Sequence, residues 1–327
     1  MMSILAFSLW LLSATFVSAA YNSTASNNVA VYWGQNSAGG ANTQRSLIQV
    51  CRNESDIILL AFLTSAINLD GGLNFANSYR PTETILLSLG GMLTDNTWAF
   101  PAPEQAVDAA NRIWAAFGPP PLTGQLTTRP FGLASVDGFD LDFEARYSNA
   151  HVFAQKLRNL TNEAKTEGRH KFYLATAPQC PFPDMNLDPV LRGDTATVLD
   201  FVFIQFYNNP PCDLRTIDGF KTGLEAWNSQ WANNTARIFM GVPGAPTAVG
   251  PANRASYVEG SVLAAKYIET ARSFSSFAGV MIWDLSQLDS NTAFLPPIVD
   301  ALNRPNHSCS PEFGTGRWSR RPPSQAS

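Results

Sequence analysis

The chain has 327 residues, of which 45% are hydrophobic and 15% are charged, and its formal net charge at pH 7 is −4. This length and composition suit one large globular domain. The mildly acidic charge argues against a nucleic-acid partner, for which a basic surface would be expected. The three histidines, His151, His170 and His307, show no metal-ligand spacing, so the sequence predicts no metal site and no cofactor.

Residues 1–20 have the pattern of a secretory signal peptide. An apolar stretch runs from Ile4 to Leu12, and Val17-Ser18-Ala19 is a small-residue cleavage pattern. The stretch is too short to cross a membrane, and no later one is long enough. We therefore expect a secreted, extracellular protein, whether free or associated with a cell wall. Triplets for N-glycosylation agree with this route and begin at Asn22, Asn53, Asn159, Asn233 and Asn306.

Short apolar runs alternate with longer segments of helical periodicity. Strands are predicted at residues 29–33, 57–63, 84–89, 138–143, 171–175, 201–206, 238–242 and 280–283. The clearest helical patterns cover residues 104–117, 150–167, 219–232 and 254–273. This alternation predicts a parallel α/β sheet, and eight units predict closure into a (β/α)8 TIM barrel. The barrel is expected to span residues 21–303, followed by a disordered tail at residues 304–327.

Residues 64–83, between the second and third predicted strands, contain no apolar pattern with a helical period. The helix between these strands is therefore predicted to be missing. A crossover of this length can still join two parallel strands. The outward faces of both strands would then be exposed to water, so we expect low stability.

Residues 137–144 carry acidic side chains at alternate positions. Successive side chains of a strand point to opposite faces, so Asp140, Asp142 and Glu144 share one face. A half-exposed sheet would place that face in water, whereas a barrel buries both faces. Buried carboxylates acquire shifted pKa values suited to acid catalysis. Glu144, at the C-terminal end, is the first candidate, and Asp137, out of phase, is expected to hold the strand or its turn.

Further motifs occur in order along the predicted strands. They are VYWGQN (31–36), LSLGG (87–91), APQCPFPD (177–184), QFYNNPPC (205–212) and GVMIW (279–283). With the acidic run, they resemble glycoside hydrolase family 18, specifically the class III, hevamine-like chitinases of fungal type. The resemblance covers roughly residues 28–300. It implies a monomeric endochitinase that cleaves β-1,4 bonds between N-acetylglucosamine units in chitin or chitooligosaccharides.

The resemblance also implies a retaining mechanism, in which the 2-acetamido group of the substrate attacks the anomeric carbon. Glu144 would protonate the leaving oxygen and later activate water. Asp142 would orient the acetamido group, and Asp140 would share a proton behind it. Tyr207 stands two residues after Gln205, which points both into the barrel, and its hydroxyl would contact the acetamido oxygen. A core tyrosine bonded to a backbone carbonyl is the alternative.

Trp283 ends the eighth predicted strand and would form an apolar floor under the sugar, since pyranose C–H faces pack well on indole. A buried core tryptophan is the alternative. By resemblance, the peptide bonds Ala61–Phe62 and Trp283–Asp284 are expected to be cis. Further sugar contacts are expected from Gln205, Asn208, Gln35 and Tyr32. For the three amide side chains, an ordinary structural role is the alternative.

Cys180 and Cys212 lie in similar contexts just beyond two predicted strands, and cysteines of a secreted chain commonly form disulfides. We expect them to pair and to brace two loops. Cys51 and Cys309 have no evident partner. In the family, the crossover that is short here carries the cysteine that pairs with the position of Cys51, so a free thiol is expected at Cys51.

Two other functions stay open. A non-catalytic lectin or inhibitor can share this fold, but such proteins usually lack the acid, which is present here as Glu144. An endo-N-acetylglucosaminidase acting on N-glycans would share the chemistry and differ in its loops.

Overall fold

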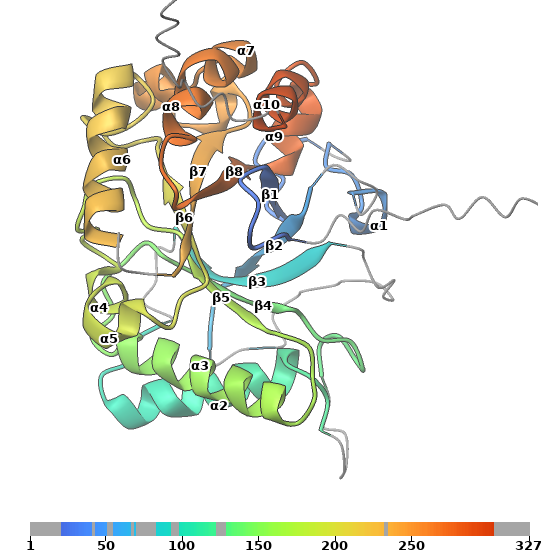
Figure 1. The fold of residues 1–327 in the computed structure, drawn as a ribbon. Helices are drawn as coiled ribbons and strands as arrows, with labels where there is room; N and C mark the ends of the chain where they lie inside the picture. The colour runs from blue at the N-terminus through green and yellow to red at the C-terminus, as the bar shows by residue number, and fades with distance from the viewer. Residues whose placement is uncertain are drawn as a thin grey trace, which may run out of the picture.

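The structure, a computed structural model, describes residues 21–40, 43–50, 55–66, 69, 83–92, 98–121, 129–231 and 235–303. In this part of the chain, eight parallel strands close into a barrel in sequence order (Figure 1). The predicted TIM barrel is confirmed. The strands are β1 (Asn28–Trp33), β2 (Ile57–Leu63), β3 (Thr84–Gly91), β4 (Gly138–Phe143), β5 (Tyr173–Thr176), β6 (Phe201–Gln205), β7 (Arg237–Pro243) and β8 (Phe277–Trp283).

Helices cover the outside of the barrel (Figure 1). Three predicted helices are confirmed as α2 (Pro103–Phe117), α3 (Ala150–Thr166) and α6 (Ile217–Trp231). Their apolar residues recur on one side of each helix and pack on the strands. The shorter helices are α1 (Leu47–Val50), α4 (Asp188–Leu191), α5 (Gly193–Ala196), η1 (Pro246–Ala248), α9 (Leu285–Ser290) and α10 (Leu295–Leu302).

The single helix predicted for residues 254–273 is wrong, because the structure divides it. A 3-10 helix, η2 (Pro251–Ser256), ends where the Ser256 hydroxyl donates to the Asn253 carbonyl at 2.7 Å. Helical structure resumes at Gly260, whose backbone lies so close to Phe294 that a Cβ would be 2.1 Å from the Phe294 carbonyl oxygen. The resumed segment comprises α7 (Gly260–Val262), the π-helical η3 (Leu263–Ile268) and α8 (Glu269–Ala271).

Strand side chains alternate between the barrel interior and the layer beneath the helices. On β2, Ile57 and Leu59 lie in the interior cluster, whereas Ile58 and Leu60 lie in the outer cluster. The predicted exposure of the outward faces of β2 and β3 is wrong, since Ile58, Leu60, Leu87 and Leu89 are at most 3% exposed. The argument for low stability from wet apolar surface therefore fails.

Several predictions fall outside the described residues and stay predictions. They are the signal peptide at residues 1–20, the missing helix within residues 64–83, the tail at residues 304–327, the free thiol of Cys51 and the state of Cys309. Within the described residues, no helix is long and apolar enough to cross a membrane.

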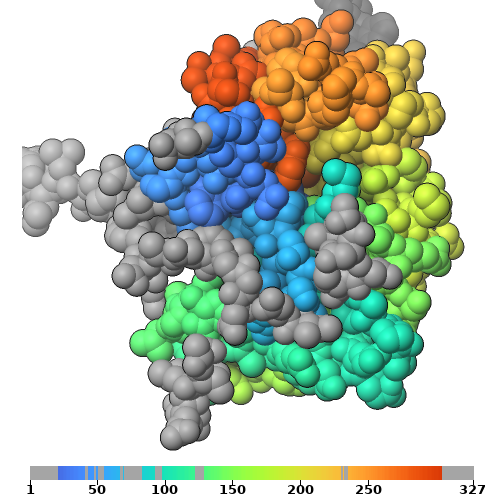
Figure 2. Space-filling model, turned by 180° about the vertical axis from the view of Figure 1, so that it is seen from behind, coloured from blue at the N-terminus to red at the C-terminus, as the bar shows by residue number. Residues whose placement is uncertain are grey.

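The two ends of the described chain meet where the barrel closes. β1 pairs with β8, with Val29 opposite Val280. Figure 2 shows the N-terminal residues, in blue, against the C-terminal helices, in red. The backbone N–H of Ser37 donates to Asp284 at 3.0 Å, and the Arg45 guanidinium pairs with Asp289 at 2.7 Å. These contacts join the segment after β1 to the segment after β8.

Candidate functional site

The acidic face of β4 lies inside the barrel, as predicted. Asp140 and Asp142 are 0% and 3% exposed, and Glu144 follows the last residue of the strand. The hydroxyls of Tyr32 and Ser88 both donate to Oδ2 of Asp140, at 2.8 and 2.7 Å. Among the described residues, Oδ1 of Asp140 has no hydrogen-bond partner. The barrel therefore holds closely spaced carboxyl groups with few donors.

This burial favours protonated acids. Burial raises the pKa of Asp140 to about 6, against the opposing effect of the hydrogen bonds from Ser88 and Tyr32. Burial also raises the pKa of Asp142 well above its usual range, with smaller contributions from the charges of Glu144, Asp140 and Asp184. Two adjacent buried carboxyls cannot readily both ionise, so the Asp140–Asp142 pair retains a proton towards neutral pH.

Glu144 is half-buried at the C-terminal end of β4. Burial raises the pKa of its carboxyl, and the negative charge of Asp184 raises it further. A carboxyl with a raised pKa at this end of a barrel can act as a proton donor. The sequence analysis did not predict a role for Asp184 or Ser88. Their positions in the motifs APQCPFPD (177–184) and LSLGG (87–91) are the features of the sequence that could have indicated one.

Gln205 and Tyr207 reach the same group of acids from β6 and the loop after it. The Gln205 side-chain amide donates to Oδ1 of Asp142 at 3.1 Å and to the Ala177 carbonyl at 2.9 Å. Tyr207 is 5% exposed, and burial, followed by the charges of Asp142 and Glu144, raises the pKa of its phenol. Gln205 thus contacts Asp142 directly, and Tyr207 lies in the field of the same acids, while their contacts with a sugar stay predictions.

Aromatic rings from three strands, β1, β2 and β8, pack together beside Trp283. The half-buried Trp283 ring stacks on Phe62, with centroids 5.8 Å apart, and meets the Tyr32 ring edge-on at 5.3 Å. Both non-proline peptide bonds expected to be cis, Ala61–Phe62 and Trp283–Asp284, are cis.

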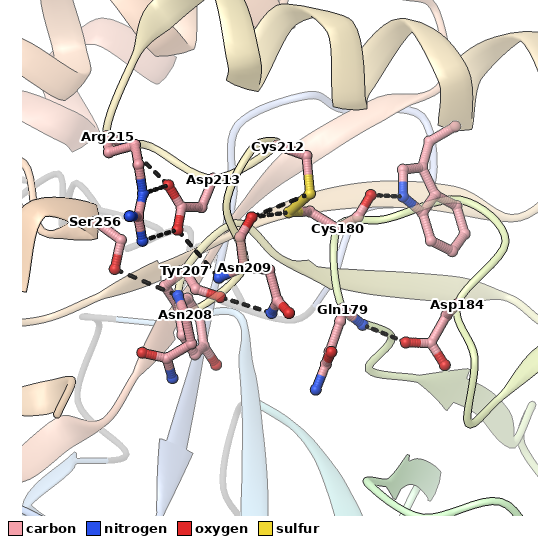
Figure 3. The surroundings of a disulfide bond; sticks show 11 residues. Gln179, Cys180, Asp184, Tyr207, Asn208, Asn209, Cys212, Asp213, Arg215 and Ser256 are labelled. Atoms are coloured by element: carbon pink, nitrogen blue, oxygen red, sulfur yellow. Dashed lines mark hydrogen bonds and ion pairs between the residues drawn. A yellow bond between two sulfur atoms is a disulfide. The ribbon is translucent and has the colours of Figure 1, made fainter. Parts of the chain in front are cut away.

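The two remaining predicted sugar contacts lie at the rim of this region and are exposed. The amide of Gln35 donates to the Ala61 carbonyl at 3.0 Å, so part of its hydrogen-bonding capacity serves the fold. Asn208 has a φ of 63°, and its backbone N–H donates to the Ser256 hydroxyl at 3.3 Å. Its exposed side chain lies beside Tyr207 in Figure 3.

A glycine permits the close approach of β3 to the acidic strand. Gly90 has a φ of +122°, and a Cβ there would lie 2.2 Å from the backbone carbonyl oxygen of Asp142. Side chains other than hydrogen are therefore excluded by both conformation and space.

The predicted disulfide Cys180–Cys212 is present and joins the loop after β5 to the loop after β6 (Figure 3). Both sulfurs lie 3.4 to 3.5 Å from the Asn209 carbonyl oxygen. These are contacts rather than hydrogen bonds, because oxidised sulfurs carry no proton. The Trp227 indole N–H donates to the Cys180 carbonyl at 2.8 Å. The disulfide thus braces the loops that carry Gln179 and Asn209.

Asp137, which was expected to hold the strand or its turn, bonds to a neighbouring strand and to a histidine. Its Oδ2 accepts from the Ile85 backbone N–H at 2.9 Å, which ties the start of β4 to β3. Its Oδ1 lies 3.2 Å from Nε2 of His170.

Two further features bear on ligand binding. In the described residues, no group of three histidine, cysteine or acidic side chains could hold a metal ion. A surface cavity of about 1160 Å³ lies elsewhere, between the residues around Arg45 and helices α9 and α10. None of the predicted site residues lines it, so we place the candidate active site at the acids of β4.

Comparison with known proteins agrees with this arrangement. Residues 28–255 match Glycosyl hydrolases family 18. The chain is 36% identical over 323 residues to Endochitinase 33 of Trichoderma harzianum, covering 87% of this chain and 94% of that protein. The solved structure of ICChI chitinase from Ipomoea carnea is 28% identical, with a TM-score of 0.64, over 84% of this chain and 99% of that one. The solved structure of the xylanase and alpha-amylase inhibitor XAIP-II from Scadoxus multiflorus is 25% identical, with a TM-score of 0.65. The match covers 84% of this chain and 98% of that one. The chain belongs to glycosyl hydrolase family 18.

Proposed function

We propose that the protein is a secreted endochitinase that hydrolyses β-1,4 bonds between N-acetylglucosamine units of chitin or chitooligosaccharides. The observation that carries this proposal is the position of Glu144, whose pKa is raised by burial and by Asp184, beside the proton-sharing pair Asp140–Asp142. The similarity to an endochitinase over most of both chains supports the same substrate.

In the first step, Glu144 donates its proton to the glycosidic oxygen as the bond to the anomeric carbon breaks. The acetamido carbonyl oxygen of the substrate attacks that carbon and forms a cyclic oxazolinium ion. With the proton of the pair on Asp140, the Asp142 carboxylate accepts from the acetamido N–H and stabilises the positive charge, while Gln205 holds it in place. Tyr207 donates its phenol hydrogen to the acetamido oxygen.

In the second step, the Glu144 carboxylate takes a proton from water, and the resulting hydroxide equivalent opens the oxazolinium ring at the anomeric carbon. Both substitutions invert that carbon, so the product keeps the β configuration. The stacked rings of Trp283 and Phe62 provide an apolar surface for the C–H face of the sugar.

The main competing function is a non-catalytic inhibitor or lectin, which the likeness to XAIP-II favours. A protein that only binds sugar has no need of a carboxyl with a raised pKa at this position. The retention of Glu144 with Asp140, Asp142 and Tyr207 around it therefore favours the enzyme.

The test is a comparison of Glu144→Gln with the wild-type protein on chitooligosaccharides. Removing the proton donor while keeping its shape should lower turnover at least about a hundredfold and preserve binding. Glu163→Gln, the same change on an exposed part of α3, is the matched control and should remain active. Near-normal turnover by Glu144→Gln, or an α-anomer as the first product in early-time NMR, would reject the proposed mechanism. Binding of chitin by an inactive wild type would favour the lectin.

We further infer that residues 1–20 are removed on secretion and that residues 21–303 act as a monomeric catalytic barrel without a cofactor. Mass spectrometry of the secreted protein tests the cleavage, and light scattering tests the monomer.

A further inference from the structure

Asp184 lies in the loop between β5 and α4 and is 2% exposed. Its carboxylate accepts hydrogen bonds from three backbone N–H groups. Oδ2 accepts from Gln179 at 3.0 Å (Figure 3), and Oδ1 accepts from Asn186 at 2.9 Å and Leu187 at 2.6 Å. Burial raises the pKa of Asp184, and these three backbone donors oppose that rise by stabilising the charged carboxylate.

The same loop is connected to the proposed catalytic acids through Gln179. Gln179 forms a parallel bridge with Gln205, whose N–H donates to the Pro178 carbonyl at 2.8 Å. The side chain of Gln205 then donates to Asp142. The carboxylate of Asp184 thus fixes the backbone segment that in turn positions Asp142.

The groups that face Glu144 are acidic or neutral. The charge of Asp184, after β5, acts on Glu144, and the charges of Glu144, Asp140 and Asp184 act on Asp142. Tyr207, after β6, lies in the field of Asp142, Glu144, Asp140 and Asp284. Arg146 and Arg192, the basic residues that flank these acids in the sequence, both pair with Asp188. In the described part of the chain, no basic side chain forms an ion pair with Asp184.

We propose that Asp184 is a positioning residue that places a fixed negative charge beside Glu144 and, through Gln179 and Gln205, holds the orientation of Asp142. This inference rests on the proposed function. Asp184 does not touch the reacting atoms and acts through the two carboxyls that do.

The chemical consequence concerns the proton of Glu144. A negative charge close to a carboxyl disfavours its ionised form, so Asp184 keeps Glu144 protonated to higher pH. The free enzyme needs that proton to protonate the glycosidic oxygen. The alkaline limb of the profile of kcat/KM against pH therefore reports the pKa of Glu144 in the free enzyme.

Asp184→Asn tests the inference. The variant should shift the alkaline limb of kcat/KM for chitooligosaccharide hydrolysis to lower pH by about one unit, the usual effect of one nearby charge. A residue with only a structural role would lower the plateau without shifting the limb. Asp188→Asn is the matched control, since it removes an equal charge four residues along that is already paired with two arginines. An unshifted limb in Asp184→Asn, or an equal shift in Asp188→Asn, would overturn the inference.

A second measurement needs neither the variant nor activity. Carbon-13 NMR titration of the wild-type carboxyls should show Asp184 charged at the pH at which Glu144 loses its proton. The reverse order of titration would contradict the inference. Because the titration needs no turnover, its outcome can be separated from a wild type that proves inactive on chitooligosaccharides, which would count against the proposed function instead.

Discussion

Asp140 has both of its hydroxyl donors on one carboxylate oxygen, and its other oxygen is buried without a partner among the described residues. Its folded pKa of about 6 lies above the value of about 3.9 expected in an unfolded chain. The folded protein therefore binds this proton more tightly than the unfolded chain does. By linkage, its contribution to the free energy of unfolding is largest below pH 4 and is lost as the pH rises through 6.

Asp140→Asn should weaken this pH dependence, because an amide keeps an acceptor for Tyr32 and Ser88 and does not ionise. As the pH rises from 4 to 7, the free energy of unfolding of the variant should increase relative to that of wild type. The upper limit of this increase is about 3 kcal/mol, which corresponds to a difference of two pKa units between the folded and unfolded states. Urea unfolding at both pH values measures it. Asp108→Asn, an exposed acid on α2, is the control. Parallel changes with pH in Asp140→Asn and wild type would contradict the assigned pKa.

At the scale of single residues, the sequence predicted site residues where a pattern within a short segment indicates them. The alternation along β4 placed Asp140, Asp142 and Glu144 on one face, and the resemblance added Tyr207 and Trp283. Contacts such as that of Ser88 with Asp140, 52 positions away, depend on strand register, which periodicity does not encode.

The proposed role of Asp184 depends likewise on a loop conformation. Its three backbone donors converge only after the segment from Gln179 to Leu187 has folded. The composition of that segment alone does not reveal the convergence.

Among the elements, β3 shows how backbone geometry supports the site. Gly90→Ala would place a methyl group against the Asp142 carbonyl and would require a conformation that side chains rarely adopt. Gly132→Ala also has a positive φ, but nothing lies within 4 Å of its added Cβ. The Gly132 variant should lose about 1 kcal/mol, and the Gly90 variant several kcal/mol more together with activity. Equal losses in urea unfolding would show that β3 can move away from β4.

Element prediction succeeded where the apolar period was uninterrupted. Strand ends differed by a few residues, as at β8, which begins at Phe277 rather than at residue 280. The helix predicted for residues 254–273 is divided in the structure, and the close approach of Gly260 to Phe294 at the restart joins segments that no local pattern connects. The outward faces of β2 and β3 were expected to be exposed to water because the helix between these strands was predicted to be missing. Instead, their outward side chains belong to the same buried cluster as Val50 and Ile113.

At the scale of the whole molecule, packing contacts close one end of the barrel, and the proposed catalytic acid lies at the other end. The Tyr21 ring packs on Phe201 at 4.4 Å and on Tyr173 at 5.6 Å, the first residues of β6 and β5. The Arg237 guanidinium donates to the carbonyls of Ser23 and Ala25 at 2.7 and 3.0 Å. This segment closes the N-terminal end of the barrel, whereas Glu144 lies beyond the C-terminal end of β4.

Tyr21→Ala should therefore affect stability without affecting the chemistry. Removing a ring that is 9% exposed and packed on other aromatic rings should lower the free energy of unfolding by about 3 kcal/mol. The kcat/KM for chitooligosaccharides, measured well below the unfolding temperature, should stay within about twofold of wild type, because no transition-state contact is lost. Tyr21→Phe keeps the ring and is the matched control, with little change expected in either quantity. A large fall in kcat/KM for Tyr21→Ala at unchanged stability would show instead that the two ends of the barrel are coupled.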